Sequence, residues 1–345
     1  WGRHWLDLVR YAESNGYERD GYKPHVWRYR DYVIKAFNDD KPYDRFLQEQ
    51  LAGDEIEPFS EEAYVATGYY RLGLWDDEPV DKLQAYYDGL DDIISVTGQS
   101  MLGLTIGCAR CHDHKIDPIP QKDYYSMVAF LNNIRHYGQR GRSGVIDASV
   151  RPLMPPDQAE ETHHVAKEFA EQKKKAEGFL RKIDKKANGA LVAGEKDDYR
   201  HEQNRVPILH KYVGDWIKQK DYERYVIEFK RLQEIRGRLS GGIQLALVVT
   251  EKGTTAPTQT VQIRGNPHVE GHAVEPAFLS ILSPPEPRVL NSAPYGKSTG
   301  RRSALAAWIG SKGNPLTARV MMNRLWQHHF GRGIVRTSEN FGRLG

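Results

Sequence analysis

The sequence lacks several features that would place a protein in a common functional class. It has no apolar run near 18 residues, which excludes a transmembrane helix. Its 49 basic and 46 acidic side chains leave a net charge of only +3, and no basic amphipathic stripe points to a membrane surface. The charge balance therefore gives no case for nucleic-acid binding. Nothing matches a serine triad, a phosphate loop or a nucleotide fingerprint, and no internal repeat is present.

Cysteine is almost absent, with two residues in a chain of 345. Both belong to one motif, Cys108-Ala109-Arg110-Cys111-His112, which has the C-x-x-C-H pattern of c-type haem attachment. Two intervening residues separate the sulfurs enough to reach both vinyl groups of one haem, and the next residue then falls under the iron. Because a neutral imidazole is a good iron ligand, the motif predicts one covalent haem c with His112 as the proximal ligand.

Three other chemistries are open to the two cysteines. A redox-active disulfide of the thioredoxin type usually lies between a strand and a helix, whereas helical sequence precedes this motif and prolines follow it. A structural zinc site needs a second pair of ligands, and the chain has no second pair of cysteines. An inert buried pair is the third alternative. The spacing favours haem over all three.

The sixth ligand of such an iron decides whether the haem carries electrons or binds a substrate. Met154 is one candidate because it lies in a proline-rich loop after the motif. His4, His328 and His329 are the others, since each lies beside aromatic residues on a predicted helix. His114 is too close to His112 to reach the far face, so we expect it to bond a haem propionate or to tune the site.

Acidic residues gather at two places that resemble cation sites only in composition. Asp76-Asp77-Glu78 and Asp88 with Asp91-Asp92 offer the carboxylates that calcium favours. Neither group has EF-hand spacing, so solvated acidic turns are the preferred interpretation over a calcium site.

Helical periodicity dominates the chain and predicts a mainly α fold. Apolar residues recur at three- and four-residue intervals in most of the chain, namely in 1–54, 61–74, 80–104, 123–132, 159–187, 207–218, 222–239 and 301–330. Strand-like segments are few and short: 243–250, 258–264 and 277–282. We expect a domain order of a helical c-type haem domain (1–137), a Gly-, Ser- and Pro-rich linker (138–158), a charged helical hairpin (159–240), a small β module (241–290) and the start of a helical C-terminal domain (291–345).

The surroundings of the motif resemble a known family. Residues 104–125, which contain Cys108-Ala109-Arg110-Cys111-His112-Asp113-His114, are similar to the hallmark of the planctomycete cytochrome-c-associated proteins. Further similar stretches are 4–18, 27–54 and 314–333. The resemblance implies two paired domains of unknown function in a secreted or periplasmic protein, with no established activity. We therefore expect a secretion signal upstream of this sequence and a second domain that starts near Asn314 and extends beyond it.

Three functions are compatible with these features. The first is electron transfer with a redox partner protein. The second is a haem-dependent oxidoreductase acting on a carbohydrate-related or other small substrate, with His328 or His4 as acid or base and Arg10 holding an anionic group. The third is a non-catalytic assembly protein that oligomerises through the helical hairpin. Because the motif implies redox chemistry but no particular substrate, electron transfer is the favoured prediction.

Overall fold

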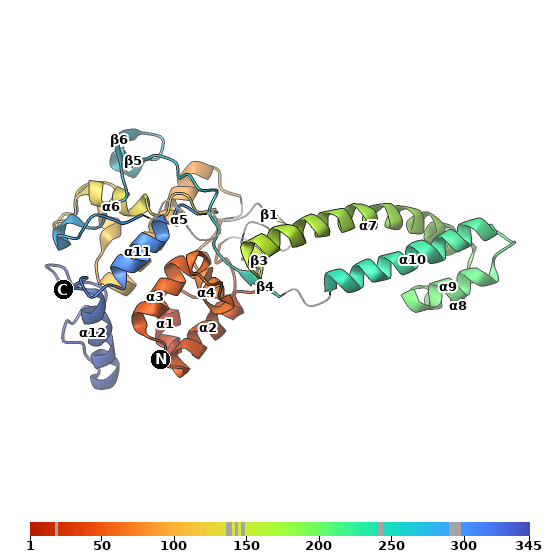
Figure 1. Ribbon diagram of the computed structural model, residues 1–345, viewed down its shortest axis with the longest axis horizontal. Helices are drawn as coiled ribbons and strands as arrows, with labels where there is room; N and C mark the ends of the chain where they lie inside the picture. The colour runs from red at the N-terminus through yellow and green to blue at the C-terminus, as the bar shows by residue number, and fades with distance from the viewer. Residues whose placement is uncertain are drawn as a thin grey trace. The chain divides into compact units, whose positions relative to one another are not determined.

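The computed structural model describes residues 1–17, 20–76, 78–135, 140–141, 144–145, 149–240, 244–289 and 298–345. Helices dominate these residues and the strands form only two-stranded sheets, which confirms the predicted mainly α fold (Figure 1). The chain divides into two compact units, one of Trp1–Pro155 with Leu245–Gly345 and one of Pro156–Gln244. Among the described residues, no helix combines the length and the apolar character that a membrane span requires.

The first unit is built on short and medium helices from both ends of the chain. They are α1 (Gly2–Leu8), α2 (Trp27–Asn38), α3 (Tyr43–Ala52), α4 (Glu61–Ala66), α5 (Lys82–Thr97), α6 (Gln121–Val128), α11 (Arg301–Ile309) and α12 (Thr317–Phe330). Single turns of 3-10 or π type join or extend them at Gly53–Glu55, Thr67–Arg71, Gly98–Leu102, Ile106–Arg110, Ile263–Gly265 and Ser280–Leu282.

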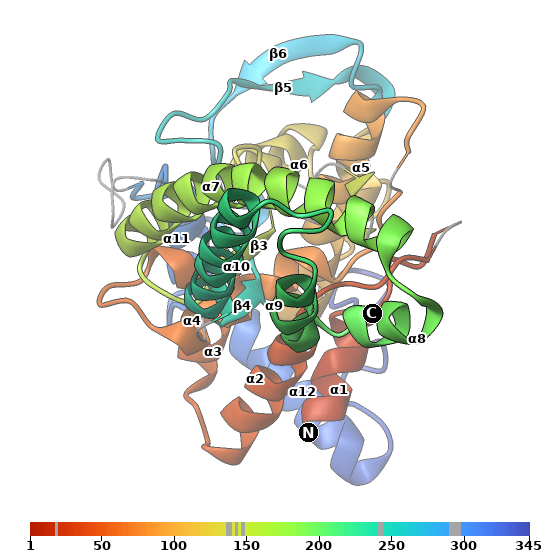
Figure 2. The same cartoon turned by 90° about the vertical axis from the view of Figure 1, so that its right-hand side faces the viewer.

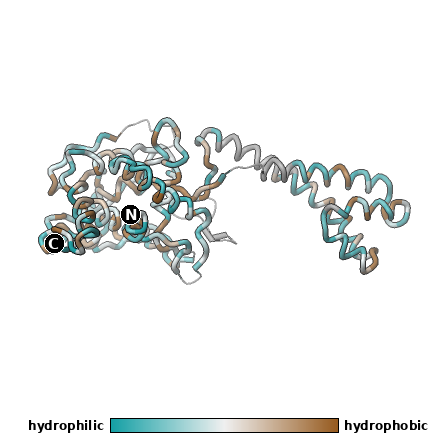
Figure 3. Tube along the Cα trace, turned by 90° about the horizontal axis from the view of Figure 1, so that it is seen from below, coloured by the Kyte–Doolittle hydropathy of each residue, from teal (hydrophilic) through white to brown (hydrophobic). Residues whose placement is uncertain are grey.

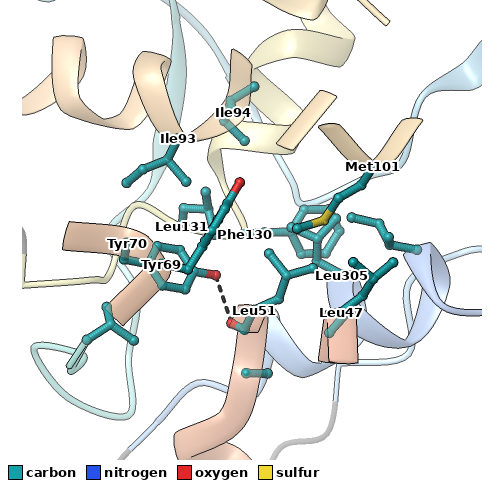
Figure 4. Close-up of a cluster of buried hydrophobic side chains, with 14 of the residues drawn as sticks. Leu47, Leu51, Tyr69, Tyr70, Ile93, Ile94, Met101, Phe130, Leu131 and Leu305 are labelled. Carbon is teal, nitrogen blue, oxygen red and sulfur yellow. Dashed lines mark hydrogen bonds between the residues drawn. The ribbon is translucent and has the colours of Figure 1, made fainter. Parts of the chain in front are cut away.

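The core of this unit lies where α3, α5 and α11 meet (Figure 4). Leu47 and Leu51 of α3 face it and are fully buried, as is Leu305 of α11, which packs against α3. The Tyr70 hydroxyl donates to the Leu51 carbonyl at 2.7 Å, so the tyrosine is buried with its polar end satisfied. Met101 is completely buried in the same cluster.

Local capping explains where two of these helices begin. The Asp81 carboxylate accepts the backbone N–H groups of Leu83 and Gln84 at 3.0 Å each, which starts α5. Residues 301–330, predicted to be helical with Pro315 at an N-terminal position, form two helices in the structure. Just ahead of the second helix, α12, the Asn314 side-chain oxygen accepts the backbone N–H of Leu316 at 2.9 Å and that of Thr317 at 3.4 Å.

The strands pair in three small antiparallel sheets. They are β1 (Arg140–Gly141) with β2 (Gly144–Val145), β3 (Val150–Pro152) with β4 (Leu245–Leu247), and β5 (Gln259–Gln262) with β6 (Glu270–Val274) (Figure 2). The strand predicted at 277–282 was wrong: this segment has no strand and ends in a 3-10 turn. Its backbone bonds to a side chain instead, since the Asp123 carboxylate accepts the Ser280 N–H and hydroxyl at 2.7 Å each.

The second unit is a long helical hairpin with two short helices at its turn (Figure 1). Its elements are α7 (Pro156–Ala190), α8 (Ala193–Tyr199), α9 (Glu202–Lys211) and α10 (Gln219–Ser240). α7 packs along α10 through a buried apolar seam that includes Leu180, Ile183, Tyr225 and Phe229. In the coloured part of the hairpin, apolar residues are interspersed in a mostly polar trace (Figure 3), as expected for helices with one buried apolar face.

Candidate functional site

Cys108 lies on a tight 3-10 turn that follows α5, and Cys111 comes directly after this turn. The π turn Gly98–Leu102 ends α5, and Gly103 then takes a left-handed conformation with φ of 63°. The turn Ile106–Arg110 packs closely against α5, because a Cβ at Gly107 would lie 2.3 Å from the Ser95 hydroxyl. A glycine directly before the motif is therefore required for this approach.

Arg110, inside the motif, ties the turn to the helices behind it. Its Nη2 donates to Asp88 of α5 at 2.6 Å. Its carbonyl accepts the Tyr125 hydroxyl at 2.9 Å and the Gln121 amide at 2.8 Å, both from α6. Nearby, burial raises the pKa of Asp91 and outweighs the hydrogen bond from Tyr124 and the charge of Arg110. The turn is thus clamped between α5 and α6.

Both thiols of the motif are free and both cysteines are exposed. The backbone of Gly265 approaches one of them, since a Cβ at this position would lie 2.7 Å from the Cys111 sulfur. Gly265 has φ of 74°, a conformation that favours glycine. The turn after β5 therefore adjoins the second cysteine without covering it.

His112 is exposed, and among the residues that the structure describes only one of its nitrogens has a hydrogen-bond partner. Its Nδ1 lies 2.6 Å from the Asp113 carbonyl, which can only accept, so Nδ1 carries the proton in the neutral ring. Nε2 is then the unprotonated nitrogen. A histidine that donates one N–H to a carbonyl and presents the other nitrogen has the arrangement common among metal-ligating histidines.

His114 is placed differently, because both of its ring nitrogens contact the protein. Nδ1 accepts the backbone N–H of Asp117 at 2.8 Å and that of Ile116 at 3.2 Å. Nε2 lies 3.3 Å from the Thr105 hydroxyl. The side chain is 8% exposed, and the backbone N–H of His114 donates to the Ile119 carbonyl. This geometry makes His114 a residue that orders the loop after the motif; its expected contact with a haem propionate stays a prediction.

The motif opens onto a pocket of about 510 Å³. Cys108, Cys111 and His112 line it, together with His114, Asn340 and Leu344. This volume is in the range of cofactor and small-molecule sites in proteins. The pocket thus brings the predicted haem-attachment residues together with residues from the far end of the chain.

The C-terminal segment is fastened to the motif loop by backbone bonds. The Asp117 carboxylate accepts the Arg343 N–H at 2.7 Å, and the Gly103 carbonyl accepts the Phe341 N–H at 2.6 Å. Gly342 lies so close that a Cβ there would be 2.2 Å from the Asp117 carboxylate. Asp117 was not among the predicted site residues. The only sequence signal for it was the turn Asp117-Pro118 directly after the motif.

The other predicted ligands lie elsewhere in this unit. The rings of His4 and His328 stack with centroids 3.7 Å apart, and Trp1 and His329 complete the group. Burial and then the neighbouring His4 lower the pKa of His328. Met154 follows β3. None of His4, His328, His329 and Met154 is among the residues that line the pocket in the described part of the chain.

The predicted catalytic group is only partly assembled. The structure brings His4 and His328 together, but the guanidinium of Arg10 forms a close pair with Asp92 of α5, with Nε lying 2.8 and 2.9 Å from the two carboxylate oxygens. The arginine therefore joins the end of α1 to α5.

The acidic groups considered for calcium have protein partners too. Asp88 and Asp91 face Arg110, and Asp76 accepts the backbone N–H of Glu78 at 2.9 Å. Asp77 lies outside the described residues, as do Glu18 and parts of the predicted linker. Within the described ranges, no group of three or more His, Cys, Asp or Glu side chains is arranged to hold a metal ion.

The chain is similar to two families of unknown function. Residues 1–136 match the model described as PSCyt2, protein of unknown function (DUF1549). Residues 301–345 match PSD1, protein of unknown function (DUF1553). The pair fits the family that the sequence around the motif resembles, and both matched segments contribute residues to the pocket. Neither a curated protein nor a solved structure matches the chain.

Proposed function

We propose that this is an extracytoplasmic electron-transfer protein with one haem c, joined through Cys108 and Cys111 and ligated by His112. One observation carries the proposal. Two exposed free thiols and an imidazole with its Nε2 available line the same pocket, whose volume suits a cofactor. The donor set is that of a c-type haem, so the residues present fit the group.

The residues of the motif would hold the group. Cys108 and Cys111 would supply the two thiols for thioether bonds to the vinyl groups, a thiol addition that consumes no oxidant. The Asp113 carbonyl holds the imidazole of His112 through Nδ1, which would leave Nε2 available as an iron ligand. When bound, the haem supplies one-electron oxidation and reduction. Arg110 and the helices behind it keep the two sulfurs at a fixed separation.

Electron transfer is favoured because both cysteines are exposed. The haem edge that carries the thioether bonds would lie at the protein surface, where a redox partner protein can approach it. Covalent haem attachment takes place outside the bacterial cytoplasm, which supports a periplasmic or secreted location. A haem-dependent oxidoreductase is the second candidate, favoured by the polar side chains of Thr105 and Asn340 in the same pocket.

The test is maturation of the protein together with a haem-attachment system, followed by intact mass, pyridine haemochrome and optical spectra. We expect the mass of one haem on the wild type, none on the Cys108→Ala/Cys111→Ala variant, and a changed iron spectrum for His112→Ala. His268→Ala, an exposed histidine paired with Asp81, is the matched control and should leave the spectrum unchanged.

An intact mass equal to the bare chain, or zinc bound at the two sulfurs, would contradict the haem proposal. The two candidate functions are separated by added carbon monoxide or cyanide. An unchanged spectrum supports an electron carrier, whereas a shifted spectrum indicates an open iron position and favours the oxidoreductase.

A further inference from the structure

Between residues 173 and 190, one face of α7 in the helical hairpin carries exposed basic side chains, one turn after the exposed Glu171. Six basic residues are exposed on it, and they recur at three-, four- and seven-residue intervals: Lys174, Lys175, Arg181, Lys182, Lys185 and Lys186. We call these six residues the basic face. The spacing places them on one side of the helix, over about 18 Å of its length at 1.5 Å per residue. The opposite side holds the buried residues Ala176, Leu180, Ile183 and Ala187.

Few acids accompany these cations. Between 173 and 190, where every residue is described, the only acids are Glu177 and Asp184, and both are partly buried. Asp184 points into the hairpin, where its Oδ1 accepts the hydroxyls of Tyr199 at 2.6 Å and Tyr225 at 2.9 Å. Glu177 lies at the edge of the basic face, 4.0 Å from Lys173 and 3.8 Å from Arg181. The exposed side of this stretch therefore carries six basic side chains and one partly exposed carboxylate at its edge.

The basic face is not apparent from the sequence, because a count along the chain lets Glu177 and Asp184 offset the lysines. In the structure Asp184 points into the hairpin, and Glu177 lies at the edge of the face beside Arg181. The partner helix α10 shows the contrast. Its exposed residues mix both signs, with Lys220, Lys230 and Arg231 beside Glu223 and Glu234.

We propose that the basic face of α7 binds an anionic lipid surface. Clusters of four to eight basic residues on an amphipathic helix attract acidic headgroups. Five of the six are lysines, compact hydrated charges suited to a diffuse anionic surface, whereas bidentate phosphate recognition in nucleic acids favours arginine. The other exposed residues between 173 and 190 are Gly178, Asn188, Gly189 and Ala190, which offer no aromatic ring to stack on bases.

The same residues determine how the hairpin would associate. Because the apolar side of α7 is packed within the hairpin, adsorption is electrostatic and inserts no hydrophobic side chain from this stretch. Binding is then reversible and weakens steeply as salt screens the charges. The proposal is independent of the haem, since every residue it uses lies in the second unit.

The test uses the full chain and sedimentation with vesicles of phosphatidylcholine alone or mixed with phosphatidylglycerol in equal parts. The face variant replaces four lysines by glutamine: Lys175, Lys182, Lys185 and Lys186. The matched control removes the same charge from the mixed-sign surface of the hairpin at Lys218, Lys220, Lys230 and Arg231. All eight positions are exposed, and circular dichroism verifies that both variants keep their helices.

We expect the wild type to bind the anionic vesicles at low salt, to dissociate from them at high salt and not to bind the neutral vesicles. The face variant should bind the anionic vesicles at least about tenfold more weakly than the wild type, and the control variant should lose much less affinity. Absence of wild-type binding at low salt would overturn the proposal, as would equal losses in the two variants. Tighter binding of duplex DNA, lost in the face variant, would overturn it in favour of nucleic acid.

Discussion

Arg302 and Asp54 form a bidentate ion pair inside the first unit, with Nη1 and Nη2 each 2.7 Å from a different carboxylate oxygen. Glu55 lies 2.9 Å from Nη2, and Glu251 lies 3.1 Å from Nε. One fully buried arginine thus faces three carboxylates from two distant parts of the chain. This cluster joins the start of the PSD1-matched segment to the PSCyt2-matched segment.

Loss of Arg302 should therefore destabilise the protein severely. Arg302→Met leaves three acidic groups buried without their cation, and removal of one partner from such a cluster costs about 3–5 kcal/mol. Urea unfolding measures the change. Arg3→Met is the control, because the Arg3 side chain is 91% exposed and its pair with Asp7 should contribute less than about 1 kcal/mol. Equal unfolding midpoints for the two variants would contradict the structural role of the cluster.

Glu55 should make stability fall as pH rises. Burial raises the pKa of Glu55 above its ordinary 4.5 and outweighs the effect of Arg302. Above pH 4.5, up to the native pKa, the folded protein keeps a proton that the unfolded chain releases, so the free energy of unfolding decreases with pH in that window. Glu55→Gln should flatten this part of the profile, whereas Glu61→Gln, at an exposed position, should not.

Urea midpoints measured from pH 4.5 upward provide the data for this comparison. Glu251 acts in the opposite direction. Burial opposes the shift, but Arg302 and the hydrogen bonds from Thr299 and Asn133 lower its pKa, so its contribution is lost only as pH falls below 4.5. Wild-type and Glu55→Gln profiles that run parallel above pH 4.5 would contradict the assignment to Glu55.

Local patterns predicted much of the fold. The repeat of apolar residues at 80–104 predicted a helix, and α5 spans Lys82–Thr97. The spacing of Cys108, Cys111 and His112 predicted that they serve one site, and all three line one pocket. These features depend on neighbours within a few residues, where helix geometry alone decides which side chains share a face.

Contacts between distant residues could not be predicted in this way. The bond from the Arg343 N–H to Asp117 spans 226 residues, and the pair of Arg302 with Asp54 spans 248. Neither contact is marked by a periodic pattern in the sequence. The stretch 277–282 has strand-like composition, yet its backbone bonds to Asp123 rather than to a neighbouring strand. Tertiary hydrogen bonding, rather than local strand propensity, therefore determines the conformation of 277–282.

The pocket wall formed by the C-terminal segment should depend on Gly342 and Asp117. Gly342→Ala would place a methyl group 2.2 Å from the Asp117 carboxylate, and Asp117→Ala would remove the acceptor of the Arg343 N–H. Both variants should increase hydrogen exchange at the amides of Phe341 and Arg343 by about fivefold, the loss expected for a net hydrogen bond of about 1 kcal/mol. Gly313→Ala, in an open position, is the control. Unchanged exchange in both wall variants would show that other contacts hold the segment.

The candidate distal ligands should have no effect on a bound haem. Met154 and His328 are not among the residues lining the pocket in the described chain, so Met154→Leu and His328→Ala should leave the optical spectrum of the matured protein unchanged. His112→Ala removes a side chain that lines the pocket and should change the optical spectrum. A spectrum altered by either distant substitution would mean that the segment carrying it moves to the iron on haem attachment.

His328, which stacks against the His4 ring, should titrate abnormally. Burial, then the nearby His4, lowers the pKa of His328 below its ordinary 6.5, because a second cation at a centroid distance of 3.7 Å disfavours protonation. A histidine with a depressed pKa costs stability as pH falls below 6.5, since the unfolded chain then binds more protons. We expect His4→Ala to raise the pKa of His328 in an NMR titration and to weaken this acid sensitivity. Met322→Ala, an exposed change on the same helix, should do neither. If the titration of His328 is identical with and without the His4 ring, the pair does not interact in solution.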